Sequence, residues 1–287
     1  MKVVFTRKDI SRNNSKAGLK RIQSYKEQLN EINVLWNIRK KNHSQSTIPL
    51  DPKLLNKLGL RKKDKILYFA GCYGDWAKAI AHQTELTYTD ATKSVLEYAK
   101  ERNKEGIKKF KLITAEMVPQ RPMIYDWSVS YEPIPLVMKD TLKFSLTRSL
   151  LNKKGAKIIY SPFFEIERSD ALKQIEKVSR IYSTQLDIKK ISVNTNSKHW
   201  TNTPTLINII TLRTNPIARR KAFLDLRILN AVDREKSLTI TQLSKRFQVN
   251  PLEVIASIKR LEQLTGDYQK GLPLNLIKLI ELAKKNW

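Results

Sequence analysis

Two glycines three residues apart interrupt the sequence directly after a short apolar run. Gly71 and Gly74 follow the run at 65–69, and an alanine-rich stretch with helical spacing begins at Asp75. Glycine at a strand-to-helix turn adopts dihedrals that a Cβ forbids, and it lets a ligand approach the main chain. Asp90 ends the next apolar run, where a carboxylate can accept hydrogen bonds from a ribose diol. The pattern predicts a nucleoside site.

Short β-type runs alternate with helical patterns around these residues. The expected strands are 65–69, 86–89, 110–114, 124–129, 156–160, 188–193 and 206–212, and the expected helices between most of them are 75–82, 93–103, 138–152 and 169–182. Strands separated by helices predict an α/β fold with a largely parallel sheet and helices on both faces. The last two strands lack an intervening helix, so we expect them to pair antiparallel at an edge.

A nicotinamide dinucleotide site is the main alternative for such a turn. The G-x-G-x-x-G pattern, whose glycines let a pyrophosphate approach a helix N-terminus, is absent. Asp75 would place a negative charge at that helix start and repel a pyrophosphate. The sequence also lacks a Walker-type phosphate loop. These features argue against a dinucleotide or a nucleoside triphosphate at this turn.

Five segments resemble, in order, the successive motifs of the class I S-adenosylmethionine-dependent methyltransferases: ILYFAGCYGDWAKAIA, LTYTDATKSVLEYAKER, KLITAEMVP, IYDWSVSYEPIPLV and LLNKKGAKIIYSP. The resemblance spans residues 65–212. It implies a seven-stranded, mostly parallel sheet with an antiparallel final strand, and S-adenosylmethionine as cofactor. The glycine loop would hold the methionine part, Asp90 the ribose, and the residues after the second and third strands the adenine. The cofactor-binding residues so implied are Gly71, Cys72, Tyr73, Gly74, Asp75, Asp90, Ala91, Glu116 and Met117.

The turn after the fourth strand is the expected catalytic position. It reads Ser130-Tyr131-Glu132-Pro133, where methyltransferases acting on base amino groups carry [N/D/S]-P-P-[Y/F/W]. Ser130 and Tyr131 would bind and stack a flipped base, and Glu132 would accept a proton from the amine. Alternatively, these residues only shape a turn. Cys72, the single cysteine, lies in the glycine loop, which excludes cytosine-C5 transfer through a cysteine nucleophile.

The charge balance indicates a phosphate-rich partner. Lys and Arg number 54 against 27 Asp and Glu, a net charge of +27, and both ends are more basic per residue than the middle. We expect nucleic acid, RNA or DNA, with Arg39, Lys40 and Lys41 near phosphates at the end of an N-terminal amphipathic helix. A solubilising surface or an anionic membrane surface is the alternative. The spacing of three histidines and one cysteine predicts no metal site.

No run in the sequence reaches the roughly 18 apolar residues of a membrane span. We therefore expect a cytoplasmic protein.

The segment 237–266 resembles winged-helix DNA-binding domains. It predicts a helix with Leu243 and Phe247 inward, a turn, and a second helix with Asn250 as cap and Pro251 as first residue. The resemblance implies that the second helix faces a major groove. Dimerisation or intrachain packing is the alternative. The nucleic-acid contacts so expected are Lys245, Arg246, Ser257, Lys259 and Arg260.

We therefore expect three parts. Residues 1–63 form a basic helical extension, 64–215 a methyltransferase-like domain, and 216–287 an all-α helix-turn-helix domain through which a homodimer could form. The predicted function is S-adenosylmethionine-dependent methyl transfer on, or tethered to, nucleic acid. A methyltransferase fold that has lost catalysis and binds nucleic acid as a regulator or architectural protein is the alternative, and protein lysine methylation is a third possibility.

Overall fold

The computed structural model describes eleven stretches of the chain. They are residues 53–69, 74–90, 93–103, 106–112, 121–131, 141–160, 170–197, 200–235, 238–265, 279–281 and 283–284. The expected amphipathic helix of the N-terminal extension, with Arg39, Lys40 and Lys41 at its end, lies outside these residues.

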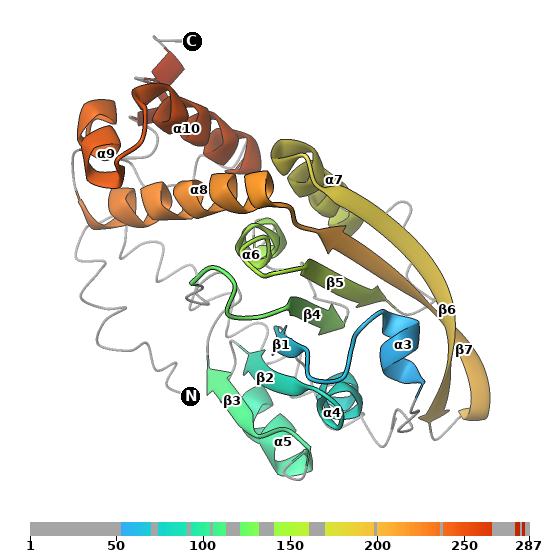
Figure 1. The fold of residues 1–287 in the computed structure, drawn as a ribbon. Coiled ribbons are helices and arrows are strands. Elements are labelled where there is room, and N and C mark those ends of the chain that lie inside the picture. The colour runs from blue at the N-terminus through green and yellow to red at the C-terminus, as the bar shows by residue number, and fades with distance from the viewer. Residues whose placement is uncertain are drawn as a thin grey trace.

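A seven-stranded sheet with the order β3-β2-β1-β4-β5-β7-β6 forms the centre of the molecule (Figure 1). The first five strands in the chain pair parallel, while β7 pairs antiparallel with both β5 and β6. The α/β class and the antiparallel final pair are therefore confirmed. The strands are β1 (Lys65–Tyr68), β2 (Glu85–Asp90), β3 (Lys109–Leu112), β4 (Trp127–Tyr131), β5 (Gly155–Tyr160), β6 (Gln185–Ser197) and β7 (Trp200–Arg213).

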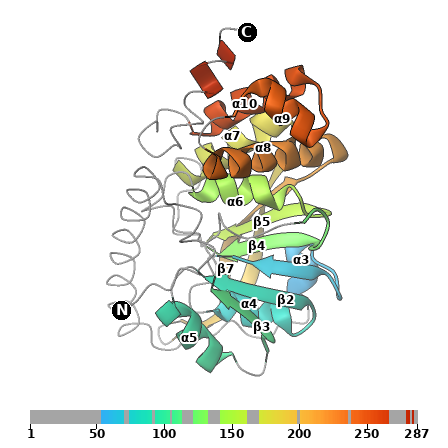
Figure 2. The same ribbon diagram turned by 90° about the vertical axis from the view of Figure 1, so that its left-hand side faces the viewer.

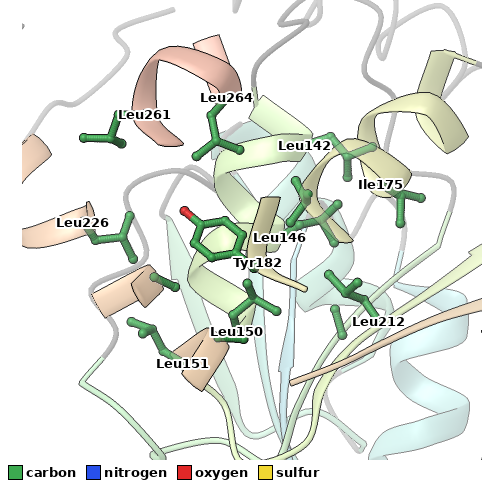
Figure 3. Close-up of a cluster of buried hydrophobic side chains, with 14 of the residues drawn as sticks. Leu142, Leu146, Leu150, Leu151, Ile175, Tyr182, Leu212, Leu226, Leu261 and Leu264 are labelled. Atoms are coloured by element: carbon green, nitrogen blue, oxygen red, sulfur yellow. The ribbon is translucent and has the colours of Figure 1, made fainter. Parts of the chain in front are cut away.

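Helices cover both faces of the sheet. The described helices are α3 (Leu54–Leu58), α4 (Asp75–Ala81), α5 (Lys93–Arg102), α6 (Thr141–Ser149), α7 (Asp170–Tyr182), α8 (Pro216–Arg234), α9 (Ile240–Phe247) and α10 (Pro251–Thr265). Side chains alternate between the two faces of a strand, so each strand contributes to two cores. One core joins α3, α4 and α5 to Tyr68, Tyr88 and Val129. The other joins α6 and α7 to Ile158 and Leu212 (Figure 3).

The predicted fourth strand is shifted. We expected 124–129, but β4 spans Trp127–Tyr131. Met123 has a left-handed φ of 65° and donates its N–H to the carbonyl of Leu151, and Ile124 is exposed. The prediction placed the start of the strand too early because apolar residues of a turn were counted as part of it. The same segment is also held to the start of β1, because the carboxylate of Asp126 accepts a hydrogen bond from the N–H of Lys65 at 2.8 Å.

The C-terminal helices continue the second core. Leu226 on α8 and Leu261 and Leu264 on α10 belong to the same buried cluster as Leu146 of α6 and Tyr182 of α7. Figure 2 shows α8, α9 and α10 stacked beyond α6 at one end of the sheet. The apolar cluster therefore crosses the boundary expected at residue 215. At the other boundary, Leu54, Leu55 and Leu58 of α3 are buried in the first core.

Two helices, α9 and α10, follow one another within 238–265. Thr239 and Gln242 form a capping box at the start of α9, and Gln248 adopts the left-handed conformation at its end. Asn250 Oδ1 accepts from the N–H of Leu252 at 2.9 Å, and α10 begins at Pro251. Leu243 is buried. The predicted start of the second helix, with Asn250 as its cap and Pro251 as its first residue, is confirmed.

Candidate functional site

The carboxyl ends of β2, β1 and β4 form one edge of the sheet. The register places Tyr68 opposite both Tyr88 and Val129, so the strands end level with one another. Strand order reverses between β1 and β4, because β2 lies on one side of β1 and the chain later returns to its other side. Open parallel sheets bind ligands beyond the carboxyl ends at such a switch point. The predicted Asp90 and Ser130 lie at this edge, and Gly74 precedes α4, the helix that connects β1 to β2.

Gly74 has a conformation and a contact that both require glycine. Its φ is 80°, and it forms the N-cap of α4, where its carbonyl accepts from the N–H of Lys78 at 2.7 Å. A Cβ would lie 2.7 Å from Asn103 Nδ2 and 3.5 Å from Tyr88 Cε2. The side of Gly74 without a side chain therefore faces α5 and β2, so this glycine serves the close packing of α4 rather than a ligand approaching from that side.

Asp90 is a buried carboxylate at the end of β2. Only 8% of it is exposed. The preceding Thr89 anchors the strand end, because its hydroxyl donates to the carbonyl of Tyr68 at 3.0 Å. Asp90 therefore lies at the carboxyl end of a central strand, where the sequence predicted the acceptor of a ligand diol.

Ser130 has a different environment from Ser128 on the same face of β4. The Ser128 hydroxyl accepts from Asn152 Nδ2 at 2.8 Å. The Ser130 hydroxyl is fully buried and has no hydrogen-bond partner in the described part of the chain. An unsatisfied buried hydroxyl costs about 1–3 kcal/mol, so in the folded protein a ligand or an ordered water is the expected partner of this one.

Tyr131 lies on the other face of β4. Its ring stacks on Trp76 of α4, with centroids 5.4 Å apart and planes 21° apart. Trp76 is buried and Tyr131 is half-buried. One face of the tyrosine ring is therefore covered by Trp76 and cannot stack a base.

The other predicted cofactor and catalytic residues lie outside the described residues. The residues outside the described stretches are Gly71, Cys72, Tyr73, Ala91, Glu116, Met117 and Glu132. Asp75 lies within the described stretches as the first residue of α4.

Two of the predicted nucleic-acid contacts face inward instead. Ser257 is fully buried and Arg260 has 13% of its side chain exposed. Ser257 belongs to the stripe formed by Val254, Ile258 and Leu261, at spacings of three and four residues, which places it on the core side of α10. The prediction that Ser257 and Arg260 point outward is therefore wrong.

The remaining three predicted contacts are on the surface. Lys245, Arg246 and Lys259 are exposed. Arg246 forms an ion pair with Glu235, and its guanidinium lies 5.9 Å from the ring centroid of Phe247.

Asp225 is the buried group that sequence analysis missed. Its carboxylate is fully buried on α8 and accepts from Arg260, from Ser257 and, at 2.8 Å, from the Tyr182 hydroxyl. Burial and the neighbouring carboxylate raise the pKa of Tyr182 above its usual value of 10, so the hydroxyl stays protonated and donates. The signal in the sequence was an aspartate between Leu224 and Leu226.

The described residues contain no group of three or more His, Cys, Asp or Glu side chains placed to hold a metal ion. Within the same stretches, every helix is too short or too polar to cross a membrane.

Comparison with known proteins finds likeness in structure only. No family model matches the chain, and no curated protein matches its sequence. Precorrin-6Y C5,15-methyltransferase from Geobacter metallireducens is 11% identical over 56% of this chain and 85% of its own, with a TM-score of 0.41. A S-adenosylmethionine-dependent methyltransferase from Methanosarcina mazei is 14% identical over 57% and 97%, with a TM-score of 0.42. The N-methyltransferase NodS from Bradyrhizobium japonicum is 12% identical over 57% and 93%, with a TM-score of 0.41.

Proposed function

We propose that this protein is a S-adenosylmethionine-dependent methyltransferase that acts on, or is tethered to, nucleic acid. The observation that carries the proposal is the placement of Asp90 and Ser130 at the carboxyl ends of β2 and β4, on either side of β1 at the switch point of the sheet. A buried carboxylate and a buried hydroxyl that has no partner in the described part of the chain, at one such edge, suit a nucleoside ligand and a polar acceptor.

Residues of this edge would hold the cofactor. Asp90 would accept the hydrogen bonds of the ribose hydroxyls, and the turn that ends at Gly74 would pass the methionine part. Ala91, Glu116 and Met117 would lie around the adenine. The cofactor, when bound, supplies an electrophilic methyl group on a sulfonium; the protein contributes positioning and exclusion of water.

The end of β4 would hold the acceptor. Ser130 has a buried hydroxyl with an unused donor and acceptor in the described part of the chain, so a substrate amine could satisfy it. Glu132 would accept the proton that the amine loses. Tyr131 would contribute through its edge and hydroxyl, since Trp76 covers one ring face.

The C-terminal helices would add affinity for nucleic acid in the manner of a winged-helix domain. Lys245, Arg246 and Lys259 are exposed on α9 and α10, and Arg39, Lys40 and Lys41 would add charge from the N-terminal extension. Affinity that comes from such contacts falls as salt rises, because phosphate contacts release counterions.

The second candidate is a methyltransferase fold that binds nucleic acid without catalysis. One observation favours it: Ser130 is 0% exposed, whereas a catalytic hydroxyl must meet its substrate. The two functions share nucleic-acid binding and differ in methyl transfer.

Calorimetry with S-adenosylmethionine followed by transfer of a labelled methyl group separates the candidates. The wild type should bind the cofactor, and Asp90→Ala should weaken it by about tenfold or more, because a charged hydrogen-bond acceptor is removed. Glu97→Gln, an exposed carboxylate on α5, is the matched control. Label should enter RNA or DNA. Cofactor binding without transfer to any total RNA, DNA or protein fraction would support the second candidate, and no cofactor binding would refute the first.

A further inference from the structure

A groove of about 200 Å³ lies between α8, the end of α6 and the segment that leads into β4. Arg121, Arg148 and Arg227 line it, together with Asn230 and the apolar Leu151 and Phe223. None of the described residues that line it is an aspartate or glutamate. The groove therefore gathers three positive charges over a partly apolar floor.

Three other arginines on the C-terminal helices are neutralised by carboxylates, whereas Arg219 donates to the backbone carbonyls of Asn152 and Lys153. Arg260 pairs with Asp225, Arg220 with Glu253 and Arg246 with Glu235. Arg121 and Arg227 have no carboxylate partner among the described residues. Like charges without counterions repel one another, and an anion between them removes that cost.

Aromatic rings orient Arg227. Its guanidinium carbon lies 4.4 Å from the ring centroid of Phe247 and 5.4 Å from that of Phe223. A stacked guanidinium keeps the N–H donors in its own plane available for bidentate contact with phosphate oxygens. The amide of Asn230 adds a neutral donor in the same groove.

The groove lies away from the predicted methyl-transfer edge. Arg121 precedes β4 and Arg148 precedes β5, so both are at the amino ends of these parallel strands, whereas Asp90 and Ser130 are at carboxyl ends. Figure 1 shows α8 next to α6 on that part of the molecule. A ligand bound in the groove would therefore not cover the predicted methyl-transfer edge.

We propose that this groove binds the phosphodiester backbone of a nucleic-acid strand and anchors it away from the methyl-transfer edge. The inference rests on the nucleic-acid partner of the proposed function but not on catalysis. The volume is below the roughly 300–1,000 Å³ typical of drug-sized ligands, so it suits a phosphate and its sugar rather than a whole cofactor. Contacts of this kind fix the strand in place without selecting its bases.

Fluorescence anisotropy with a labelled single-stranded RNA, and with DNA of the same sequence, tests the proposal on the full chain. Arg121→Gln and Arg227→Gln should each weaken binding roughly tenfold, since each removes a charge-assisted hydrogen bond. The slope of log affinity against log salt should fall by about 0.7 for each phosphate that a variant no longer neutralises. RNA and DNA should be affected alike.

Arg180→Gln on the exposed part of α7 is the matched control, since it removes the same charge outside the groove. Arg227→Lys keeps the charge but loses the planar set of guanidinium donors. Its affinity for the labelled strand should lie between those of the wild type and Arg227→Gln. All variants should bind S-adenosylmethionine as the wild type does, and thermal unfolding checks their fold. If the groove variants bind RNA and DNA as Arg180→Gln does, with unchanged salt slopes, the groove proposal is wrong while the proposed function stands. If the wild type binds neither strand, both the groove and the nucleic-acid part of the function are refuted.

Discussion

Arg260 of α10 donates two hydrogen bonds to the buried carboxylate of Asp225 on α8, at 2.9 Å from Nε and 2.6 Å from an NH₂ nitrogen. The carboxylate also accepts from Tyr182 of α7 and Ser257 of α10. Three helices that are far apart in sequence therefore share one satisfied polar centre inside an apolar cluster. The contact joins α10 to α8 and to α7, which packs on the sheet.

Removal of the arginine should destabilise the fold strongly. Arg260→Met leaves Asp225 as a buried charge without its cation, so we expect a loss of about 3–5 kcal/mol in the free energy of unfolding. The double variant Asp225→Leu with Arg260→Met should lose less than the single variant. Lys259→Met, an exposed neighbour, should change stability by less than about 0.5 kcal/mol. Urea denaturation measures all three. Equal stability of Arg260→Met and Lys259→Met would mean that the pair does not hold the helices together.

Gly74 should not tolerate a side chain. Alanine there must keep a φ of 80° and place its Cβ 2.7 Å from Asn103 Nδ2. The left-handed conformation alone costs about 1–2 kcal/mol for a residue with a Cβ. Gly106→Ala is the control, because the nearest atom to its Cβ would be Lys78 Cγ at 3.4 Å, an ordinary contact. Denaturation should show a larger loss for Gly74→Ala. If Gly74→Ala lowers the free energy of unfolding no more than Gly106→Ala does, the backbone at residue 74 can adjust to a side chain without cost.

The architecture was predictable because each strand and helix carries its own periodic pattern. The runs at 65–69 and 156–160 became β1 and β5 within one residue at each end, since buried parallel strands are continuously apolar. The start of β4 was not predictable from the sequence, because Met123 and Ile124 are apolar residues in an exposed turn. Composition cannot distinguish such a turn from a strand; the hydrogen bond to Leu151 that shapes it comes from a distant segment.

The candidate site was predictable in part for the same reason. Asp90 and Ser130 end two strands, and parallel strands that end level bring their last residues together. The orientation of Ser257 and Arg260 was not predictable from α10 alone, because a polar residue beside an apolar stripe turns inward only when another helix offers a partner. That partner is Asp225, 32 residues before Ser257.

Ser130 and Ser128 should respond in opposite ways to the same substitution. Ser130→Ala removes a buried hydroxyl that has no partner in the described part of the chain, so stability should stay equal or rise by up to about 1 kcal/mol. Ser128→Ala removes the acceptor of Asn152 Nδ2, so stability should fall by about 1 kcal/mol. Chemical denaturation of the two variants gives the comparison. If Ser130→Ala loses as much as Ser128→Ala, its hydroxyl is satisfied in the folded protein and the acceptor role proposed for it is undermined.

Lys157 is a buried lysine on the face of β5 opposite Ile158, and only 4% of it is exposed. Its ammonium lies 4.4 Å from the ring centroid of Trp127 and donates to Thr211 Oγ1 at 3.3 Å. Burial, with repulsion from Arg213, lowers the pKa of Lys157 to about 8. Below that pH the folded protein must hold a poorly solvated charge, which destabilises it relative to the unfolded chain.

Stability should therefore rise with pH through the window between the folded pKa of about 8 and the unfolded value near 10.4, because the unfolded chain binds more protons there. Lys157→Met keeps the packing but removes the charge, so it should be more stable than the wild type near pH 7 by up to about 3 kcal/mol. That advantage should shrink as the pH approaches about 10. Lys190→Met, an exposed lysine on β6, should follow the pH dependence of the wild type. Denaturation curves at several pH values measure the difference. A gap between wild type and Lys157→Met that stays constant with pH would mean that the ammonium keeps its proton throughout, so that Trp127 and Thr211 compensate the cost of burial in full.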